Sequence, residues 1–146
     1  MRKLFVLLVV IGAITTAFVK KQETTMAPNA GGAGIKFSGM TLEEAKKEAK
    51  ATGKTIFIDC YTSWCGPCKM MASTAFMDDK VADLFNSKFI NLKIEMEKSD
   101  DGPVAARAYG VKVYPTLLFI DGDGKLKKSV MGAQSAEQLL AVGKSL

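Results

Sequence analysis

The sequence predicts an α/β fold in which helices flank a central mixed β-sheet. Short continuous apolar runs, typical of buried strands, alternate with helical patterns along residues 35–146. A hairpin and a last helix follow, which adds antiparallel strands to the sheet. With 48% hydrophobic and 24% charged residues, the chain of 146 residues has the composition of one globular domain plus a short leader.

The domain begins with a helix and a buried strand. Thr41-x-x-Glu44 is a capping box that opens a helix, and Gly53 is placed to end it. Residues 55–61 predict a strand covered on both faces, because three consecutive apolar residues stand at its centre.

The middle of the domain alternates between helix and strand. A second helix is predicted after Cys65, with an interruption near residues 73–77 and a new start at Asp78-Asp79, whose carboxylates suit a helix N-terminus. Residues 89–96 predict a strand. Residues 103–109 predict a short helix that begins at its proline.

The C-terminal part predicts a hairpin and a final helix. Residues 116–120 and 127–131 form its strands, joined by a turn at Asp121-Gly122-Asp123-Gly124. This run resembles part of a calcium loop, but it lacks the spacing to a terminal glutamate that such loops need. Ser135-x-x-Gln138 is a second capping box, which opens the last helix.

Residues 1–17 have the features of a secretory signal peptide. A basic start at Arg2 and Lys3 precedes an apolar run, and small residues end at Ala17. The apolar stretch 4–19 is 16 residues long, shorter than the roughly 20 that a helix needs to span a bilayer. We therefore predict cleavage after Ala17, with an uncleaved membrane anchor as the alternative. Either outcome predicts an exported protein, periplasmic or otherwise extracytoplasmic.

Residues 18–34 predict a flexible linker, because Pro28 and the cluster Gly31-Gly32-Ala33-Gly34 interrupt any periodicity. The folded domain is predicted to span residues 35–146.

The net charge does not indicate a nucleic-acid partner. The formal charge of +5 falls to +3 without residues 1–17, since these contain two basic residues and no acids. Lysines and glutamates alternate along residues 43–50, as on a solvated helix, and no basic face with interleaved aromatics is evident.

Trp64-Cys65-Gly66-Pro67-Cys68 lies at a predicted strand-to-helix transition. A cysteine at a helix N-terminus meets unsatisfied N–H groups and the positive end of the helix dipole, both of which favour the thiolate. Cys65 is therefore the predicted nucleophile. Cys68, about one turn further on, is placed to resolve a mixed disulfide. Gly66 permits a tight approach, and Pro67 suits an early helical position.

Two other interpretations of the cysteine pair are weaker. A zinc site normally needs four ligands, yet the chain has no histidine and only one further cysteine, Cys60, so zinc would require a partner chain. A purely structural disulfide between Cys65 and Cys68 would close a very short loop and restrain little of the unfolded chain. No metal site is expected.

Residues 56–69, which include Trp64-Cys65-Gly66-Pro67-Cys68, closely resemble the thioredoxin family. The resemblance extends over most of residues 35–146. Tyr114-Pro115-Thr116 matches the family's cis-proline signature, which faces the cysteines, and Gly132 matches a glycine on the substrate-binding rim. Residues 74–81 are more similar to exported thioredoxin-like proteins and to the C-terminal domain of transmembrane disulfide reductases.

The resemblance implies a thioredoxin fold and a redox-active Cys65–Cys68 disulfide that needs no cofactor. It implies protein substrates that carry disulfides. Together with the predicted export, it also implies a membrane-embedded thiol reductase as the electron donor.

The resemblance further assigns a buried acid to Asp59, six residues before Cys65. Burial raises the pKa of a carboxyl group, and Asp59 could then accept the proton of Cys68 through water. The alternative is a partly exposed acid at the strand end. Lys93 matches a lysine that approaches this acid and could modulate it, or it is a simple surface lysine. Cys60 points to the opposite face of the strand and is expected to be a buried small hydrophobe.

A substrate-binding rim is expected around the cysteines. The backbone at Tyr114 and Pro115 would bind an extended peptide much as an added strand does. The residues expected on this rim are Trp64, Gly66, Pro67, Tyr114, Pro115, Met131 and Gly132.

The dipeptide Gly66-Pro67 is the one found in thioredoxins, whose couple is strongly reducing at about −270 mV. We therefore predict reduction of protein disulfides. The alternatives are a disulfide oxidase or isomerase and, from a different class, a non-catalytic adaptor or chaperone. An adaptor would not need both cysteines together with Asp59 and Pro115.

Overall fold

The computed structural model describes residues 34–146. The expected signal peptide, residues 1–17, lies outside the described residues, as does the expected linker apart from Gly34. Gly34 itself is buried, and its carbonyl oxygen accepts a hydrogen bond from Asn86 Nδ2 at 3.2 Å. Within residues 34–146 no helix is both long and apolar enough to cross a membrane.

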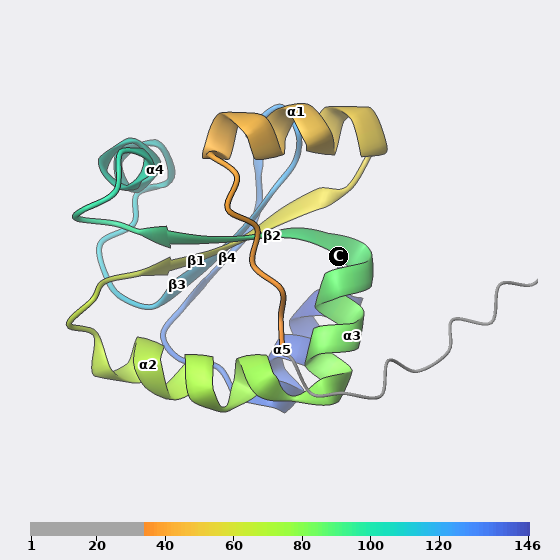
Figure 1. Ribbon diagram of the computed structural model, residues 1–146, viewed down its shortest axis with the longest axis vertical. Helices are drawn as coiled ribbons and strands as arrows, with labels where there is room; N and C mark the ends of the chain where they lie inside the picture. Colours follow the sequence, from red (N-terminus) through yellow and green to blue (C-terminus); the bar gives the residue numbers. More distant parts are fainter. Residues whose placement is uncertain (1–33) are drawn as a thin grey trace, which may run out of the picture.

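The helices and strands alternate as the sequence predicts (Figure 1). In chain order they are α1 (Leu42–Thr52), β1 (Thr55–Tyr61), α2 (Gly66–Ser73), a 3-10 turn (Ala75–Met77), α3 (Asp79–Lys88), β2 (Phe89–Glu95), α4 (Asp101–Tyr109), β3 (Thr116–Ile120), β4 (Leu126–Met131) and α5 (Ala136–Lys144).

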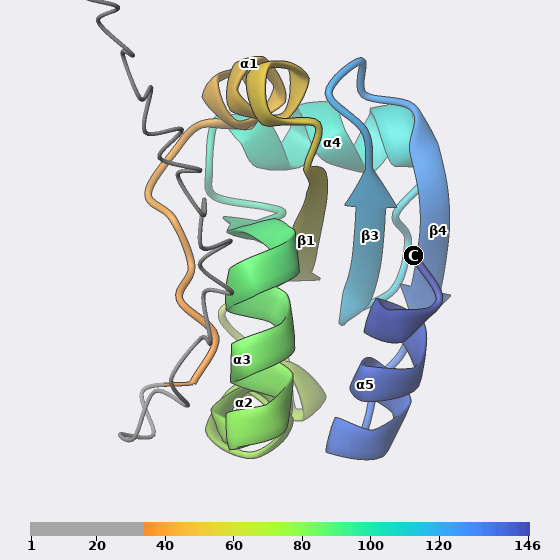
Figure 2. The ribbon, with the colours of Figure 1, turned by 90° about the vertical axis from the view of Figure 1, so that its right-hand side faces the viewer.

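The strands form one mixed sheet in the order β2-β1-β3-β4. Strands β1 and β2 are parallel, whereas β3 is antiparallel to both β1 and β4. Helices α1 and α4 cover one face, and α2, α3 and α5 cover the other (Figures 1 and 2). The predicted fold class, a central mixed sheet flanked by helices, is confirmed.

The predicted caps set several helix boundaries. The capping boxes of Thr41 with Glu44 and of Ser135 with Gln138 are both formed. Asp78 caps α3 by accepting the Val81 N–H at 3.0 Å. Gly53 ends α1 with a φ of 72°, a conformation that favours glycine.

The start of α4 differs from the prediction. The helix begins at Asp101, two residues before Pro103. The N–H groups of a first helical turn have no acceptor within the helix, so a proline at the third position costs no hydrogen bond. Gly102 lets this turn pack closely, because a Cβ there would lie 2.4 Å from the Glu95 carbonyl oxygen.

Two strand ends also differ from the prediction by one residue. Strand β2 ends at Glu95 rather than at Met96, and β4 begins at Leu126 rather than at Lys127. Met96 still donates its N–H to the Tyr61 carbonyl at 2.8 Å, so the chain stays beside β1 just beyond the strand.

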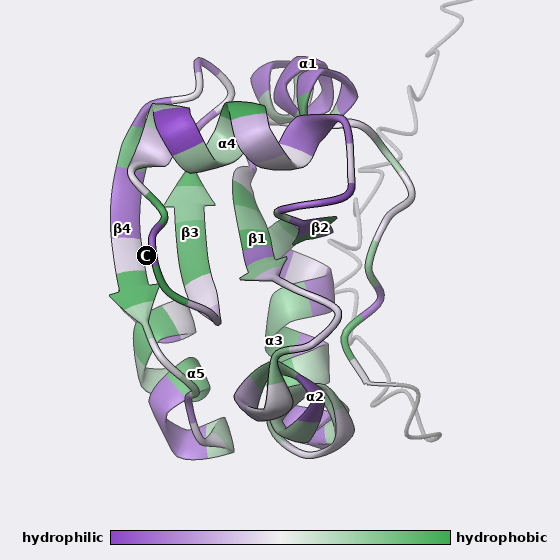
Figure 3. Ribbon diagram, turned by 90° about the vertical axis from the view of Figure 1, so that its left-hand side faces the viewer, coloured by the Kyte–Doolittle hydropathy of each residue, from purple (hydrophilic) through white to green (hydrophobic). Residues whose placement is uncertain are grey.

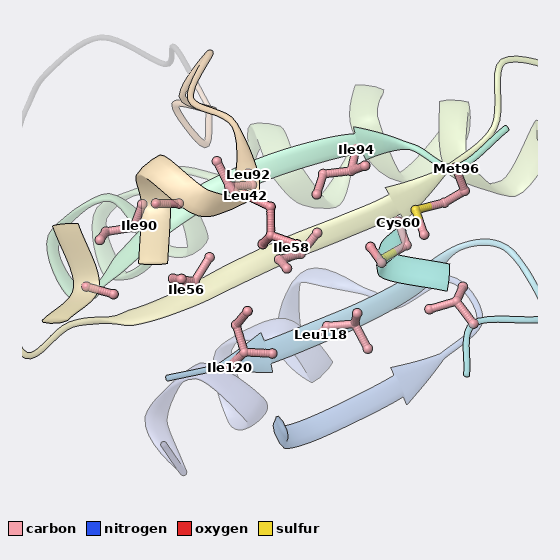
Figure 4. Packing of buried hydrophobic residues seen from close by; sticks show 14 residues of the cluster. Leu42, Ile56, Ile58, Cys60, Ile90, Leu92, Ile94, Met96, Leu118 and Ile120 are labelled. Atoms are coloured by element: carbon pink, nitrogen blue, oxygen red, sulfur yellow. The ribbon is translucent and has the colours of Figure 1, made fainter. Parts of the chain in front are cut away.

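Alternation along the strands divides the core between the two faces. The cluster under α1 and α4 contains aliphatic residues such as Ile56, Ile58 and Leu92 (Figure 4). The cluster under α2, α3 and α5 is rich in aromatic rings, among them Phe57 and Phe119 with centroids 5.2 Å apart. Strands β1 and β3 are mostly hydrophobic, with one hydrophilic band in β1, whereas β4 is more hydrophilic (Figure 3).

The same alternation places polar side chains beneath α2. Because side chains two apart share a face, Asp59 lies on the face of Phe57, and Lys93 lies on the face of Phe89. Asp59 and Lys93 are register partners in the parallel β1–β2 pair. The fold therefore brings an acid and a base together on the side of the sheet that carries the cysteine helix.

Candidate active site

Cys65 and Cys68 form a disulfide at the start of α2, with Sγ–Sγ and Cα–Cα distances of 2.04 and 5.3 Å. Cys65 is the N-cap of the helix, and its Sγ accepts the Cys68 N–H at 3.1 Å. Pro67 occupies the first turn. Both cysteines are almost enclosed, with 3% and 2% of their surface exposed. A negative charge on Cys65 would be stabilised by this N–H and by the helix dipole.

Asp59 lies fully buried on β1, and its Oδ2 forms an ion pair with Lys93 Nζ at 2.5 Å. Its Oδ1 has no hydrogen-bond partner within the described residues. Burial raises the pKa of Asp59, and the Lys93 charge and hydrogen bond only partly counter that effect. The expected buried acid is therefore present, and the partly exposed alternative is wrong.

Lys93 is not a simple surface lysine. Its Nζ lies 4.2 Å from the centroid of the Tyr61 ring, 5.5 Å from that of Phe37 and 5.7 Å from that of Phe76. These distances suit cation–π attraction. The side chain keeps 28% of its surface exposed, so the ammonium group reaches both the buried carboxylate and solvent.

A small pocket with a volume of about 100 Å³ links Cys68 to Lys93. It is lined by Tyr61, Thr62, Ser63, Cys68, Lys69, Ala72 and Lys93. Thr62 is buried, and its hydroxyl has no hydrogen-bond partner within residues 34–146. A space of this size holds water when polar groups line it. The pocket therefore brings Cys68 and the lysine of the ion pair to the walls of one space.

Cys60 lies on the other face of β1, among the apolar side chains under α1 and α4 (Figure 4). It is fully buried and forms no disulfide. Burial, with a smaller effect from the Asp59 charge, raises the pKa of its thiol. The prediction of a small buried hydrophobe is confirmed, and Cys60 is separated from the redox pair by the sheet.

Several residues expected on the substrate rim are exposed. Trp64 and Met131 expose 64% and 72% of their surface, and Pro67 is also exposed. The Trp64 ring meets that of Tyr114 edge to face, with centroids 6.0 Å apart. A Cβ added at Gly66 would meet no atom of residues 34–146 within 4 Å, so the side of the chain at Gly66 is open.

The segment before β3 lies beside the end of β4. The Tyr114–Pro115 peptide bond is cis, and Pro115 is buried. The Gly132 N–H donates to the Pro115 carbonyl at 2.8 Å, and Gly132 has a φ of 84°. Met131 is the register partner of Thr116. The structure thus brings the expected rim residues from three separate parts of the chain to the same end of the sheet.

Two acids near the site were missed by the sequence analysis. Glu95 accepts N–H groups from Ser63 at 3.0 Å, Glu97 at 2.9 Å and Lys98, which ties the loop after β2 to the loop before Cys65. Partial burial raises the pKa of Glu95, but these hydrogen bonds outweigh it and lower that pKa overall. Glu97 Oε2 accepts the Trp64 indole N–H at 2.9 Å. The only feature of the sequence that could have indicated these two acids was the position of Glu95 at the end of the strand that contains Lys93.

Within residues 34–146, no group of three or more His, Cys, Asp or Glu side chains is arranged to hold a metal ion.

Comparison with known proteins agrees with this geometry. A thioredoxin-like domain family model matches residues 42–146. The thioredoxin of Chlorobaculum thiosulfatiphilum is 32% identical over 98 residues, which cover 67% of this chain and 84% of that protein.

Solved structures extend the likeness to the fold. A protein of Bacteroides thetaiotaomicron, described as a candidate disulphide-isomerase, is 45% identical with a TM-score of 0.67, over 77% of this chain and 93% of that one. A thioredoxin of Thermus thermophilus has a TM-score of 0.66 at 20% identity, over 77% and 86% of the two chains, and supports the fold alone. The thioredoxin fold expected from the sequence is confirmed.

Proposed function

The chain belongs to the thioredoxin-like domain family, and from this premise we propose that it is an exported reductase of protein disulfides. It is a thiol-disulfide oxidoreductase with a Cys-x-x-Cys disulfide pair, Cys65–Cys68. One observation supports Cys65 as the cysteine that attacks the substrate. Cys65 is the N-cap of α2, and its sulfur accepts the Cys68 N–H.

In the first step the Cys65 thiolate attacks one sulfur of a substrate disulfide. A new bond forms between Cys65 Sγ and that sulfur, the substrate disulfide breaks, and the second substrate sulfur leaves as a thiolate. The helix N-terminus supports this step because it stabilises the Cys65 thiolate before attack.

In the second step Cys68 attacks Cys65 Sγ and releases the remaining substrate thiol. Cys68 must lose its proton to do so, and water in the adjoining pocket would pass it to Asp59. The Asp59 carboxylate, with its raised pKa, is a better proton acceptor at neutral pH than an ordinary aspartate. The step ends with the Cys65–Cys68 disulfide, and the two electrons reside on the substrate thiols.

In the third step a donor dithiol reduces the Cys65–Cys68 disulfide to the dithiol and is itself oxidised to a disulfide. Residues 1–17 support a location outside the cytoplasm, where a membrane-embedded thiol reductase would deliver these electrons. No metal or organic cofactor enters the proposed cycle.

Disulfide isomerisation is the second candidate. The 45% identical Bacteroides thetaiotaomicron protein described as a candidate disulphide-isomerase favours it. The dipeptide Gly66-Pro67 favours reduction, since thioredoxins share it and have strongly reducing couples.

The proposal is tested by insulin reduction, with residues 35–146 as the protein and dithiothreitol as the electron donor. Cys65→Ser should abolish the protein-dependent rate, while Cys60→Ala, which changes the cysteine behind the sheet, should retain it. Full activity of Cys65→Ser would contradict the proposed nucleophile. Repair of scrambled ribonuclease without net reduction of insulin would favour isomerisation instead.

A further inference from the structure

Glu97 is an acid at the edge of the active site whose charge is unpaired. Its Oε2 accepts the Trp64 indole N–H at 2.9 Å, and this is its one side-chain hydrogen bond within residues 34–146. The side chain is exposed, and none of the ion pairs in the described part of the chain includes it.

The neighbouring charged groups do not neutralise it. Lys98, the next residue, directs its Nζ to Ser63 Oγ at 2.9 Å. Lys93 is paired with Asp59. Glu95 uses its carboxylate to accept backbone N–H groups. Glu97 therefore differs from Glu95 in having a negative charge that the loop itself does not use.

Glu97 also lies beside the aromatic residues expected to contact a substrate. Trp64 precedes Cys65 directly, is 64% exposed, and packs edge to face on Tyr114. The pKa of Tyr114 is raised, first by partial burial and next by the Glu97 charge. A cation held by Glu97 would lie near the exposed Trp64 ring, which attracts cations through its π face.

We propose that Glu97 and Trp64 select substrate segments that carry a lysine or arginine next to the disulfide cysteine. This inference rests on the proposed function and adds a substrate class to it. The Glu97 carboxylate is the charged group that hydrogen-bonds to Trp64, it belongs to no ion pair within residues 34–146, and a basic side chain complements it. Arginine suits the site especially well, because its planar guanidinium stacks on an aromatic ring while it pairs with a carboxylate.

The expected effect is modest because the pair would be exposed to water. Exposed ion pairs contribute little, so the preference should be about 1.4- to fivefold in rate. It should also fall with salt, because the screening length shrinks from about 10 Å at 0.1 M to about 3 Å at 1 M.

The test uses three cyclic peptides, each with one disulfide, that differ only in the residue after one cysteine: arginine, serine or glutamate. The measurement is the second-order rate constant for oxidation of the pre-reduced protein at low ionic strength. We expect the order arginine, serine, glutamate, with about 1.4- to fivefold between neighbours. The preference should disappear at 1 M NaCl.

Glu97→Gln removes the charge and keeps an oxygen to accept the Trp64 N–H, so the arginine-to-serine ratio should fall to about one. Glu97→Lys should reverse the order. Glu48→Gln is the matched control, since it removes an exposed carboxylate from α1 on the opposite face of the sheet, and it should leave the wild-type ratio intact.

Equal rates for the three peptides in the wild type, or an arginine preference that survives Glu97→Gln, would overturn the inference while the reductase function stands. A wild-type protein that reduces none of the peptides would overturn the reductase function as well.

Discussion

Asp59 and Lys93 face each other in the parallel register of β1 and β2 and form an ion pair beneath the cysteine helix. The acid is fully buried, whereas the lysine side chain is 28% exposed and lines the pocket that contains Cys68. The pair thus connects a carboxylate hidden from water with the space beside the resolving sulfur. It supplies the route by which we propose that the proton of Cys68 leaves.

Asp59→Asn should slow insulin reduction around neutral pH by up to about 10²-fold, the lower end of what general acid–base catalysis contributes. The wild-type rate should rise with pH through the raised pKa of Asp59, and the variant should lack that rise. Lys93→Gln is the companion variant. It removes the charge that lowers the pKa of Asp59, so the same rise should move to higher pH. Identical pH profiles in all three proteins would exclude Asp59 as the proton acceptor.

Asp59 should also make stability depend on pH. Its folded-state pKa is raised above the unfolded value of about 3.9, so the folded protein binds more protons between these two values. Stability due to this group is therefore complete below about pH 3.9 and is lost as pH rises through the folded-state pKa. In urea unfolding, the free energy of unfolding of Asp59→Asn relative to that of the wild type should increase with pH across that window. A constant difference from pH 4 to pH 9 would contradict the raised pKa.

Cys60 should be inert in the folded protein. Oxidised protein contains one free thiol, since two of its three cysteines form the disulfide. Burial raises the pKa of that thiol and shields it, so Ellman's reagent should detect almost none in buffer and about one per chain in guanidinium. Rapid labelling in buffer would show that the sheet does not protect it.

Gly102 should be essential to the packing of α4. A Cβ there would lie 2.4 Å from the Glu95 carbonyl oxygen and 2.7 Å from the Met96 backbone, so Gly102→Ala should cost about 1–3 kcal/mol of the free energy of unfolding. Gly39→Ala is the matched control. A Cβ at Gly39 meets no atom within 4 Å, and its cost should stay within about 0.5 kcal/mol. Equal losses would mean that α4 is free to move away from β2.

Local sequence signals predicted most of the fold because they act over a few residues. Capping boxes at Thr41 and Ser135, the helix-ending Gly53 and the N-cap at Asp78 all lie within one turn of what they control. The predicted start of α4 was wrong because the first turn of a helix tolerates proline. Pro103 therefore did not mark the first residue of the helix.

The site was predictable where residues are close in sequence or match a family motif. The strand position of Asp59, the place of Cys65 before a helix and the opposite orientation of Cys60 follow from spacing and alternation. The contact of Trp64 with Glu97, 33 residues apart, depends on the loop after β2, for which no local pattern exists. The rings around Lys93 come from three separate segments and were equally hidden.

Cys68→Ser should trap substrates as mixed disulfides on Cys65, because attack still occurs while resolution cannot. Adducts of higher mass should appear on non-reducing gels after expression with the N-terminal segment intact, and they should vanish with dithiothreitol. The double variant Cys65→Ser, Cys68→Ser is the control and should form none. Equal adducts in the double variant would assign them to Cys60 and contradict the role of Cys65.

The reduction potential of the Cys65–Cys68 couple tests the reductase function most directly. It is measured by equilibrating the 35–146 protein with glutathione buffers and following the fluorescence of Trp64, the residue next to Cys65. The dipeptide Gly66-Pro67 predicts a value well below about −200 mV, near the roughly −270 mV of thioredoxin. A value above about −150 mV, towards the roughly −120 mV of a strong disulfide oxidant, would contradict reduction and assign disulfide formation to this protein.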